Sequence, residues 1–298
     1  EEPVRQGALG HLWRRLRSSA GQLRHSIPRA ATAALMAVLI LPTLALAGGL
    51  PVLSAGSGSA APHKIATLPA ALSSAATPSG PRAPPSTAAL ARRTSCRSVV
   101  YIGDSTSEGE TSTDYIPNPS LRLPAQLGDV GVKTTVPEIS GARSIVETFQ
   151  GEPNAATVAQ DHISQGFHGC WIVAMGTNDV DNVHTGSTYT FGYRIQKMMS
   201  SIGSQPVMWV DVITLLPPGD PYSEASMQQW NHALLQACAR YPNMRVFDWA
   251  AYAQRKWFIS DGIHYYSPGY VARSRRIAQG LAHAFPDGQP PNPSCVVR

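Results

Sequence analysis

From residue 96 onward, short strand-like runs alternate with longer segments in which apolar residues recur every three or four positions. The strand-like runs lie at 98–103, 132–139, 170–175, 206–213 and 244–249. Helical patterns lie between or after them, at 120–127, 155–165, 187–201, 224–241 and 267–285. Strands that alternate with helices pair in parallel and form a sheet that the helices cover. The pattern therefore predicts an α/β domain with a parallel sheet of five strands.

Two of the helical segments have a clear apolar face. In 224–241 this face is formed by Met227, Trp230, Leu234 and Cys238, which recur at helical spacing. In 267–285 it is formed by Val271, Ala278, Leu281 and Phe285. We expect the arginines of that last segment to lie on its opposite side.

The N-terminal part of the chain has a different pattern. No charged residue occurs between Arg29 and His63, and the apolar stretch 30–53 is long enough to cross a bilayer core of roughly 30 Å as a helix. It is preceded by Arg14, Arg15, Arg17, Arg24 and Arg29, which predicts a cytoplasmic N-terminal side and an exported C-terminal side. The alternative is a signal peptide cleaved near Ala45-Leu46-Ala47.

The residues after this stretch are rich in Ser, Ala, Pro and Gly and show no hydrophobic period. Such a composition buries too little apolar area to offset its ordering entropy, so 54–95 is predicted to be a disordered linker. The chain therefore divides into a basic cytoplasmic segment, a membrane helix, a linker and one folded domain, at 1–29, 30–53, 54–95 and 96–298.

The charges are as uneven as the apolar residues. Through Arg93 there are ten Lys and Arg against two acids, a net charge of +8, whereas from Thr94 onward fourteen stand against seventeen, a net charge of −3. The basic pI of about 9.1 thus comes from the N-terminal third. The folded domain lacks the basic composition of a nucleic-acid-binding protein, so no nucleic acid partner is expected.

The chain contains four cysteines, and all of them lie in the predicted exported domain. An oxidising compartment favours two disulfides, for which three connectivities exist. Cys96 precedes the first strand and Cys295 follows the last helix, while Cys170 begins the third strand and Cys238 ends a helix that returns to the same edge. These positions predict the pairs Cys96–Cys295 and Cys170–Cys238.

Polar residues capable of chemistry follow several of the predicted strands. They are Gly103-Asp104-Ser105, Ser140-Gly141 and Gly176-Thr177-Asn178-Asp179, and Asp261 stands three residues before His264 near the last helix. The carboxyl ends of parallel strands meet at one edge of the sheet, where ligands bind. Together the segments supply a nucleophile, a base, an acid to orient the base and hydrogen-bond donors. We expect Asp104 to act structurally, by binding nearby backbone amides.

This set of residues resembles the SGNH (GDSL-like) hydrolase family over 97–285. The resemblance implies a flavodoxin-like three-layer α/β/α fold and no cofactor or metal. It implies that Ser105 is the nucleophile, with Asp261 and His264 as its acid and base. It also implies that an oxyanion hole is formed by Ser105, Gly141 and Asn178. Thr106 stands where the family often has leucine, which leaves the subfamily open.

The first residues, Glu1-Glu2-Pro3-Val4-Arg5, resemble the closing segment of multi-pass membrane acyltransferases that modify envelope glycans. Some members of that family continue through a membrane helix and a spacer into an SGNH domain. The resemblance implies the C-terminal portion of a longer, membrane-anchored O-acyltransferase with an extracytoplasmic catalytic domain. Its partners would be an acyl-ester donor, an envelope polysaccharide acceptor and an upstream membrane domain.

Three other interpretations remain open. A free-standing SGNH esterase would use the same residues to remove acyl groups from glycans or lipids. A metal-dependent phosphoesterase also has Gly-Asp and Gly-Asn turns, but it needs several histidine ligands, and the spacing of His162, His168 and Cys170 matches no zinc pattern. An inactive glycan-binding module would have no need for Ser105 and His264 together.

Overall fold

The structure is a computed structural model of the 298-residue chain, and it describes residues 92–298. The predicted membrane helix at 30–53 and nearly all of the predicted linker at 54–95 lie outside these residues. Within 92–298, no helix combines the length and the apolar character that crossing a membrane requires.

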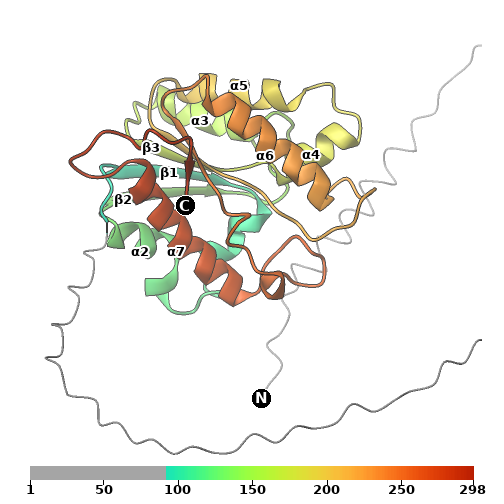
Figure 1. Ribbon diagram of the computed structural model, residues 1–298, viewed down its shortest axis with the longest axis horizontal. Helices are drawn as coiled ribbons and strands as arrows, with labels where there is room; N and C mark the ends of the chain where they lie inside the picture. Colours follow the sequence, from blue (N-terminus) through green and yellow to red (C-terminus); the bar gives the residue numbers. More distant parts are fainter. Residues whose placement is uncertain (1–91) are drawn as a thin grey trace, which may run out of the picture. The chain divides into compact units, whose positions relative to one another are not determined.

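A six-stranded sheet forms the centre of the described domain (Figure 1). Its strands are β1 Ser98–Gly103, β2 Thr134–Ile139, β3 Cys170–Ala174, β4 Val207–Val210, β5 Met244–Phe247 and β6 Val296–Val297. Their order is β2-β1-β3-β4-β5-β6, and every neighbouring pair is parallel. The five predicted strands are confirmed, but the predicted total of five is wrong. The sixth strand has two residues, too few for any pattern to reveal, and it forms only by pairing with β5.

Helices cover both faces of the sheet, which makes three layers (Figure 1). The helices α2 Leu123–Asp129 and α7 Ser267–Ala284 pack on the face that carries Val99 and Tyr101. The opposite face, with Val100 and Ile102, packs against α3 Ala155–Ser164, α5 Phe191–Ile202 and α6 Glu224–Cys238. Both faces of β1 are therefore fully buried, as expected for a central parallel strand.

Four shorter elements lie in the connections between strands and helices. They are α4 Thr177–His184 and the 3₁₀ helices η1 Ser105–Glu110, η2 Pro119–Leu121 and η3 Arg255–Trp257. The sequence analysis did not predict α4, because its residues TNDVDNVH contain only two apolar positions. The helix starts where Gly176, at φ 144°, turns the chain away from β3. A Cβ at Gly176 would lie 2.3 Å from the indole nitrogen of Trp230, so the close packing requires glycine.

The strand order locates the place where a ligand can bind. From β1 the chain first adds β2 on one side and then β3 on the other, so β1 and β3 flank the point at which the winding reverses. The order β2-β1-β3-β4-β5 is that of the flavodoxin-like doubly wound fold, in which ligands bind beyond the carboxyl ends of the strands at this switch point. Ser105 follows β1 and Asn178 follows β3.

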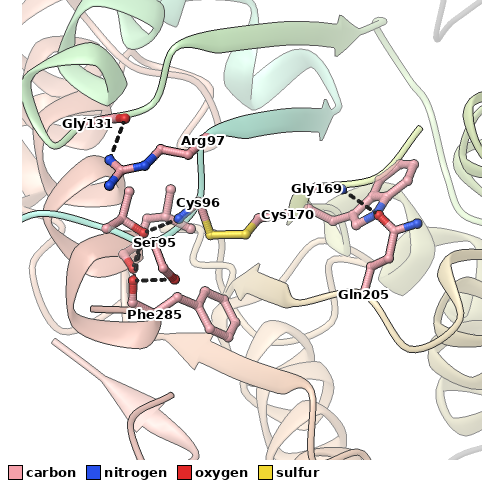
Figure 2. The surroundings of a disulfide bond; sticks show 11 residues. Ser95, Cys96, Arg97, Gly131, Gly169, Cys170, Gln205 and Phe285 are labelled. Atoms are coloured by element: carbon pink, nitrogen blue, oxygen red, sulfur yellow. Dashed lines mark hydrogen bonds between the residues drawn. A yellow bond between two sulfur atoms is a disulfide. The ribbon is translucent and has the colours of Figure 1, made fainter. Parts of the chain in front are cut away.

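The disulfides differ from the predicted pairs. The structure joins Cys96 to Cys170 and Cys238 to Cys295, with Cα–Cα distances of 5.6 Å and 6.0 Å, so the pairs Cys96–Cys295 and Cys170–Cys238 are wrong. Cys96 lies just before β1, and Cys170 begins its neighbour β3 (Figure 2). Cys295 immediately precedes β6, the strand that was not predicted. A disulfide requires a Cα separation below about 7 Å, so pairing depends on which strands are neighbours and not merely on a shared edge.

The chain entering β1 is tied to the end of α7. The Thr94 side chain is fully buried and its hydroxyl donates to the backbone oxygen of Phe285 at 2.8 Å. The backbone N–H of Ser95 donates to the same oxygen at 2.9 Å. Figure 2 shows these contacts beside the Cys96–Cys170 disulfide. The packed part of the domain therefore includes Thr94.

Candidate active site

The turn after β1 presents Ser105 at the carboxyl edge of the sheet. Asp104 is the N-cap of η1, and its Oδ1 accepts hydrogen bonds from the Thr106 backbone N–H at 2.9 Å and hydroxyl at 2.7 Å. This is the structural role predicted for Asp104. A Cβ at Gly103 would lie 2.7 Å from the Ser107 hydroxyl, so glycine allows η1 to fold back over the strand end. Ser105 is thereby fixed as the first residue of η1.

Three of the predicted site residues form one hydrogen-bonded chain. The His264 Nε2 lies 2.8 Å from the Ser105 Oγ, and its Nδ1 lies 2.7 Å from the Asp261 Oδ2. The second oxygen of Asp261 accepts from the backbone N–H groups of Ile263 and His264, at 2.8 and 3.0 Å. These two bonds fold the short loop so that both side chains converge on the serine.

The charge of Asp261 indicates where the protons lie in the hydrogen-bonded series Asp261–His264–Ser105. Burial alone raises the pKa of the Asp261 carboxyl, but the hydrogen bond from His264, the positive charge of that ring and the two backbone N–H groups lower it to about 2. The carboxylate is therefore ionised at neutral pH and accepts from His264 Nδ1. When the ring is neutral and its proton lies on Nδ1, Nε2 accepts from the Ser105 hydroxyl, the arrangement that a general base requires.

Asn178 lies in the first turn of α4 and joins three segments of the chain. Its Nδ2 donates to the backbone oxygen of Arg143 at 3.1 Å, and its Oδ1 accepts from the Tyr222 hydroxyl at 3.2 Å. These contacts fix which end of the amide is the donor. An amide nitrogen has two N–H groups, so the bond to Arg143 leaves a second donor for a ligand.

Gly141 lies in a tight turn that follows β2. The Ser140 backbone N–H donates to the oxygen of Gly103 at 3.2 Å, and the Arg143 N–H donates back to the oxygen of Ser140 at 3.4 Å. Ala142, inside this turn, has a φ of 54°, a conformation that is strained for a residue with a Cβ. The turn is thus held against the end of β1 by Ser140 and against Asn178 by Arg143. The oxyanion-binding role of Gly141, Asn178 and the Ser105 N–H remains a prediction.

A buried cluster around Arg273, the Arg273 cluster, supports the helix that carries Ser105. The Arg273 Nη1 lies 3.0 Å from the Glu110 carboxylate and donates to the hydroxyls of Tyr101 and Ser107, both at 3.2 Å. The Tyr101 hydroxyl donates to the other Glu110 oxygen at 2.6 Å. These contacts join α7 and β1 to η1, the helix that begins with Ser105.

A second cluster, the Arg194 cluster, supports the helix that carries Asn178. The Arg194 guanidinium pairs with Asp179 at 2.9 Å and with Glu147, and it also donates to the Ser187 hydroxyl. The Asp179 Oδ1 in turn accepts from the backbone N–H of Ile145 at 2.9 Å. The cluster thus fastens α4, which carries Asn178, to the segment that follows the Gly141 turn.

The sequence analysis missed both arginines as site-supporting residues. Arg273 was expected on the exposed side of its helix, yet its side chain is only 3% exposed, so that expectation is wrong. Arg273 stands four residues before Ile277 and eight before Leu281, both buried, and this spacing already places it on the apolar face. Arg194 stands four residues before Met198 and eight before Ile202 in α5, both buried, so the same reasoning applies to it.

Residues that could suggest a metal site have other partners. Cys170 is bonded to Cys96, and His162 Nε2 lies 2.8 Å from the Glu138 carboxylate. In the described part of the chain, no three His, Cys, Asp or Glu side chains are grouped so that they could hold a metal ion.

No family model matches the sequence, and no curated protein matches it. Several solved structures are similar. A lipase/acylhydrolase from Enterococcus faecalis is 16% identical with a TM-score of 0.47, over 65% of this chain and 99% of that one. The carbohydrate acetylesterase Est24 from Sinorhizobium meliloti is 20% identical with a TM-score of 0.48, over 63% and 100%. The C-terminal catalytic domain of Streptococcus pneumoniae peptidoglycan O-acetyltransferase A is 14% identical with a TM-score of 0.45, over 61% and 89%.

Proposed function

We propose that this chain is a serine-dependent acyl-transfer enzyme of the SGNH type. The observation that carries the proposal is the unbroken chain Asp261–His264–Ser105, with contacts of 2.7 and 2.8 Å, at the switch point of the sheet. A serine hydroxyl is a weak nucleophile until a neighbouring base removes its proton. This geometry supplies the base, and it supplies the carboxylate that orients the base and stabilises its protonated form.

The proposed reaction proceeds in two halves. His264 takes the Ser105 proton as Oγ bonds to the ester carbonyl carbon, and the carbonyl oxygen becomes an oxyanion. The N–H groups of Ser105 and Gly141 and the amide of Asn178 stabilise that charge. The bond to the leaving alcohol then breaks, and the alcohol takes the proton from His264. A water or a second alcohol reverses these steps on the acyl-serine and releases acid or a new ester.

We further propose that the second alcohol is a hydroxyl of an envelope glycan and that the domain works outside the cytoplasm. Two disulfides support an oxidising compartment. The predicted membrane helix at 30–53 and the linker at 54–95 support a tether, and the segment Glu1–Arg5 supports an upstream membrane acyltransferase domain as the source of the acyl donor.

Hydrolysis is the alternative outcome of the same intermediate. The His264 side chain is 15% exposed, so water can reach the base that would activate it. Transfer requires an acceptor held close enough to compete with water at about 55 M. Adding a neutral envelope-type oligosaccharide to a donor ester should divert product from free acid to acylated sugar, as followed by mass spectrometry. Free acid alone with a broad acceptor panel would identify an esterase.

The direct kinetic test of the proposal is Ser105→Ala in the full chain. We expect kcat/KM on small activated esters to fall by at least about 10⁴-fold with little change in thermal stability, because only the nucleophile is lost. Ser120→Ala, at an exposed serine of η2, is the matched control and should retain full activity. Residual activity above about 1% in Ser105→Ala, relative to wild type, would rule out this mechanism.

A further inference from the structure

Glu108 lies on the same side of η1 as the nucleophile. It stands three residues after Ser105 within the 3₁₀ helix Ser105–Glu110. A 3₁₀ helix has three residues per turn, so side chains at positions i and i+3 are eclipsed. The neighbouring Gly109 packs closely against the ring of Tyr270 in α7, since a Cβ at Gly109 would lie only 2.3 Å from that ring. This contact determines which side of η1 faces α7. Packing against α7 therefore prevents η1 from turning Glu108 away from the site.

The carboxylate of Glu108 differs from the other acids around the nucleophile. Asp104 binds Thr106, Glu110 pairs with Arg273, and Asp261 binds His264. Glu108 is half-buried, yet within residues 92–298 its carboxylate has neither a hydrogen-bond partner nor an ion-pair partner. A partly desolvated carboxylate without a partner costs free energy, so the fold itself gives no reason for it.

The surroundings of Glu108 place it beside the catalytic groups. Burial raises the pKa of Glu108, the positive charge of His264 lowers it, and Asp104 raises it, so all three groups lie within electrostatic reach. Burial and the negative charges of Glu108, Asp261 and Asp114 raise the pKa of Tyr115. The Tyr115 ring is fixed edge-on against Tyr270, with centroids 5.1 Å apart. Glu108 thus lies within electrostatic reach of His264, and Tyr115 within reach of Glu108 and Asp261.

We propose that Glu108 determines substrate class at this site by accepting a hydrogen bond or an ionic contact from the group next to the scissile ester. The favoured class is then esters with hydroxyl-bearing or cationic neighbouring groups, such as neutral or amino-substituted sugars. Esters with a carboxylate or phosphate in that position are disfavoured by repulsion. The inference rests on the proposed function, since it assigns Glu108 to the site where Ser105 reacts.

The test compares esters that differ only in charge. One pair varies the acyl side, with 4-nitrophenyl hemisuccinate against 4-nitrophenyl valerate. The other varies the alcohol side, with acetylcholine against its uncharged analogue 3,3-dimethylbutyl acetate. The measured quantity is the ratio of kcat/KM within each pair, for the full chain and for Glu108→Gln, Glu108→Lys and Asp114→Asn. Asp114 is the matched control, because it is an exposed acid in the loop that follows η1.

We expect Glu108→Gln to shift at least one ratio by on the order of tenfold, toward the anionic or away from the cationic ester, because a unit charge at a partly exposed site has an effect of this size. Glu108→Lys should shift the same ratio further in the same direction, and Asp114→Asn should change it by less than about twofold. Ratios within about twofold of wild type in both Glu108 variants would overturn the inference. The proposed function fails separately, if Ser105→Ala remains active.

Discussion

The two arginine clusters perform the same task on opposite faces of the sheet, but their charge balance differs. The Arg273 cluster is sealed, with one guanidinium and one carboxylate whose side chains are 3% and 0% exposed. The Arg194 cluster places one guanidinium between two carboxylates, of which Asp179 is fully buried and Glu147 is 29% exposed. The helix that carries Ser105 is thus supported by one buried ion pair with balanced charge. The helix that carries Asn178 is supported by a partly hydrated group with one more negative than positive charge.

The imbalance separates the acidities of the two carboxylates in the Arg194 cluster. Burial raises the pKa of Asp179 to about 6, against the opposing effect of Arg194 and of the Ile145 N–H. Burial also raises the pKa of Glu147, but this is outweighed by hydrogen bonds from Arg194 and Ser187 and by the charge of Arg194, which lower the pKa to about 2. Both are ionised at neutral pH. We therefore expect the two clusters to respond differently to mutation and to acid.

The largest expected effect is the loss of stability when Arg273 is removed. Arg273→Met leaves the Glu110 carboxylate buried without its cation and should lower the free energy of unfolding by about 3–5 kcal/mol. Arg194→Met should cost less, because Glu147 can be hydrated in place and Asp179, whose pKa is already raised to about 6, can take up a proton. Urea denaturation measures both, with the exposed neighbour Arg275→Met as control. An Arg194→Met variant less stable than Arg273→Met would contradict the comparison.

The next effect tests the predicted oxyanion donor Asn178 by activity. Asn178→Ala should lower kcat by about 10²–10³-fold through the loss of one oxyanion donor, with the fold intact. Tyr222→Phe removes the hydroxyl that orients the amide and should cost about five- to tenfold, the effect of one hydrogen bond. Steady-state kinetics on one activated ester measures both. A loss below tenfold for Asn178→Ala would exclude it as an oxyanion donor.

The smallest effect is the response of the Arg194 cluster to acid. The pKa of Glu147 is lowered from 4.5 to about 2 in the folded state. Its contribution to the free energy of unfolding is therefore complete above pH 4.5 and is lost as the pH falls toward 2. A shift of this size is worth about 3 kcal/mol. The pKa of Asp179 is raised from 3.8 to about 6, so Asp179 has the opposite effect and lowers the free energy of unfolding as the pH rises from about 4 to 6.

Glu147→Gln should therefore flatten the loss of stability between pH 5 and pH 3, as measured by urea denaturation at several pH values. Glu152→Gln, at an exposed acid of the same loop, is the control. Equal slopes for wild type and Glu147→Gln would show that Glu147 is not stabilised by the cluster.

The hydrogen-bonded group of Ser105, His264 and Asp261 could be predicted from the sequence because its parts are local. Asp261 and His264 are three residues apart in one loop, and Ser105 comes two residues after the predicted strand 98–103. The strands and the main helices were likewise predicted, since hydrophobic period 2 or 3.6 reports burial within one segment.

What the sequence did not reveal depends on contacts between distant segments. The strand β6 exists only through pairing with β5, and Cys96 meets Cys170 only because β1 and β3 are neighbours. Arg194 receives its second carboxylate from Glu147, 47 residues earlier in the chain. The sequence pattern also gives no sign of Glu108, because only the folded structure shows that its carboxylate has no partner among the described residues.

The central claim is that Ser105 is the nucleophile activated by His264, and covalent trapping tests it most directly. The full chain is treated with a small sulfonyl fluoride, which sulfonylates activated serines, and is analysed by intact mass and peptide mapping. We predict one adduct per chain, on the peptide that contains Ser105, with parallel loss of esterase activity. Ser105→Ala should remain unmodified and His264→Ala should react far more slowly. An adduct on another residue, or modification of His264→Ala at the wild-type rate, would contradict the account.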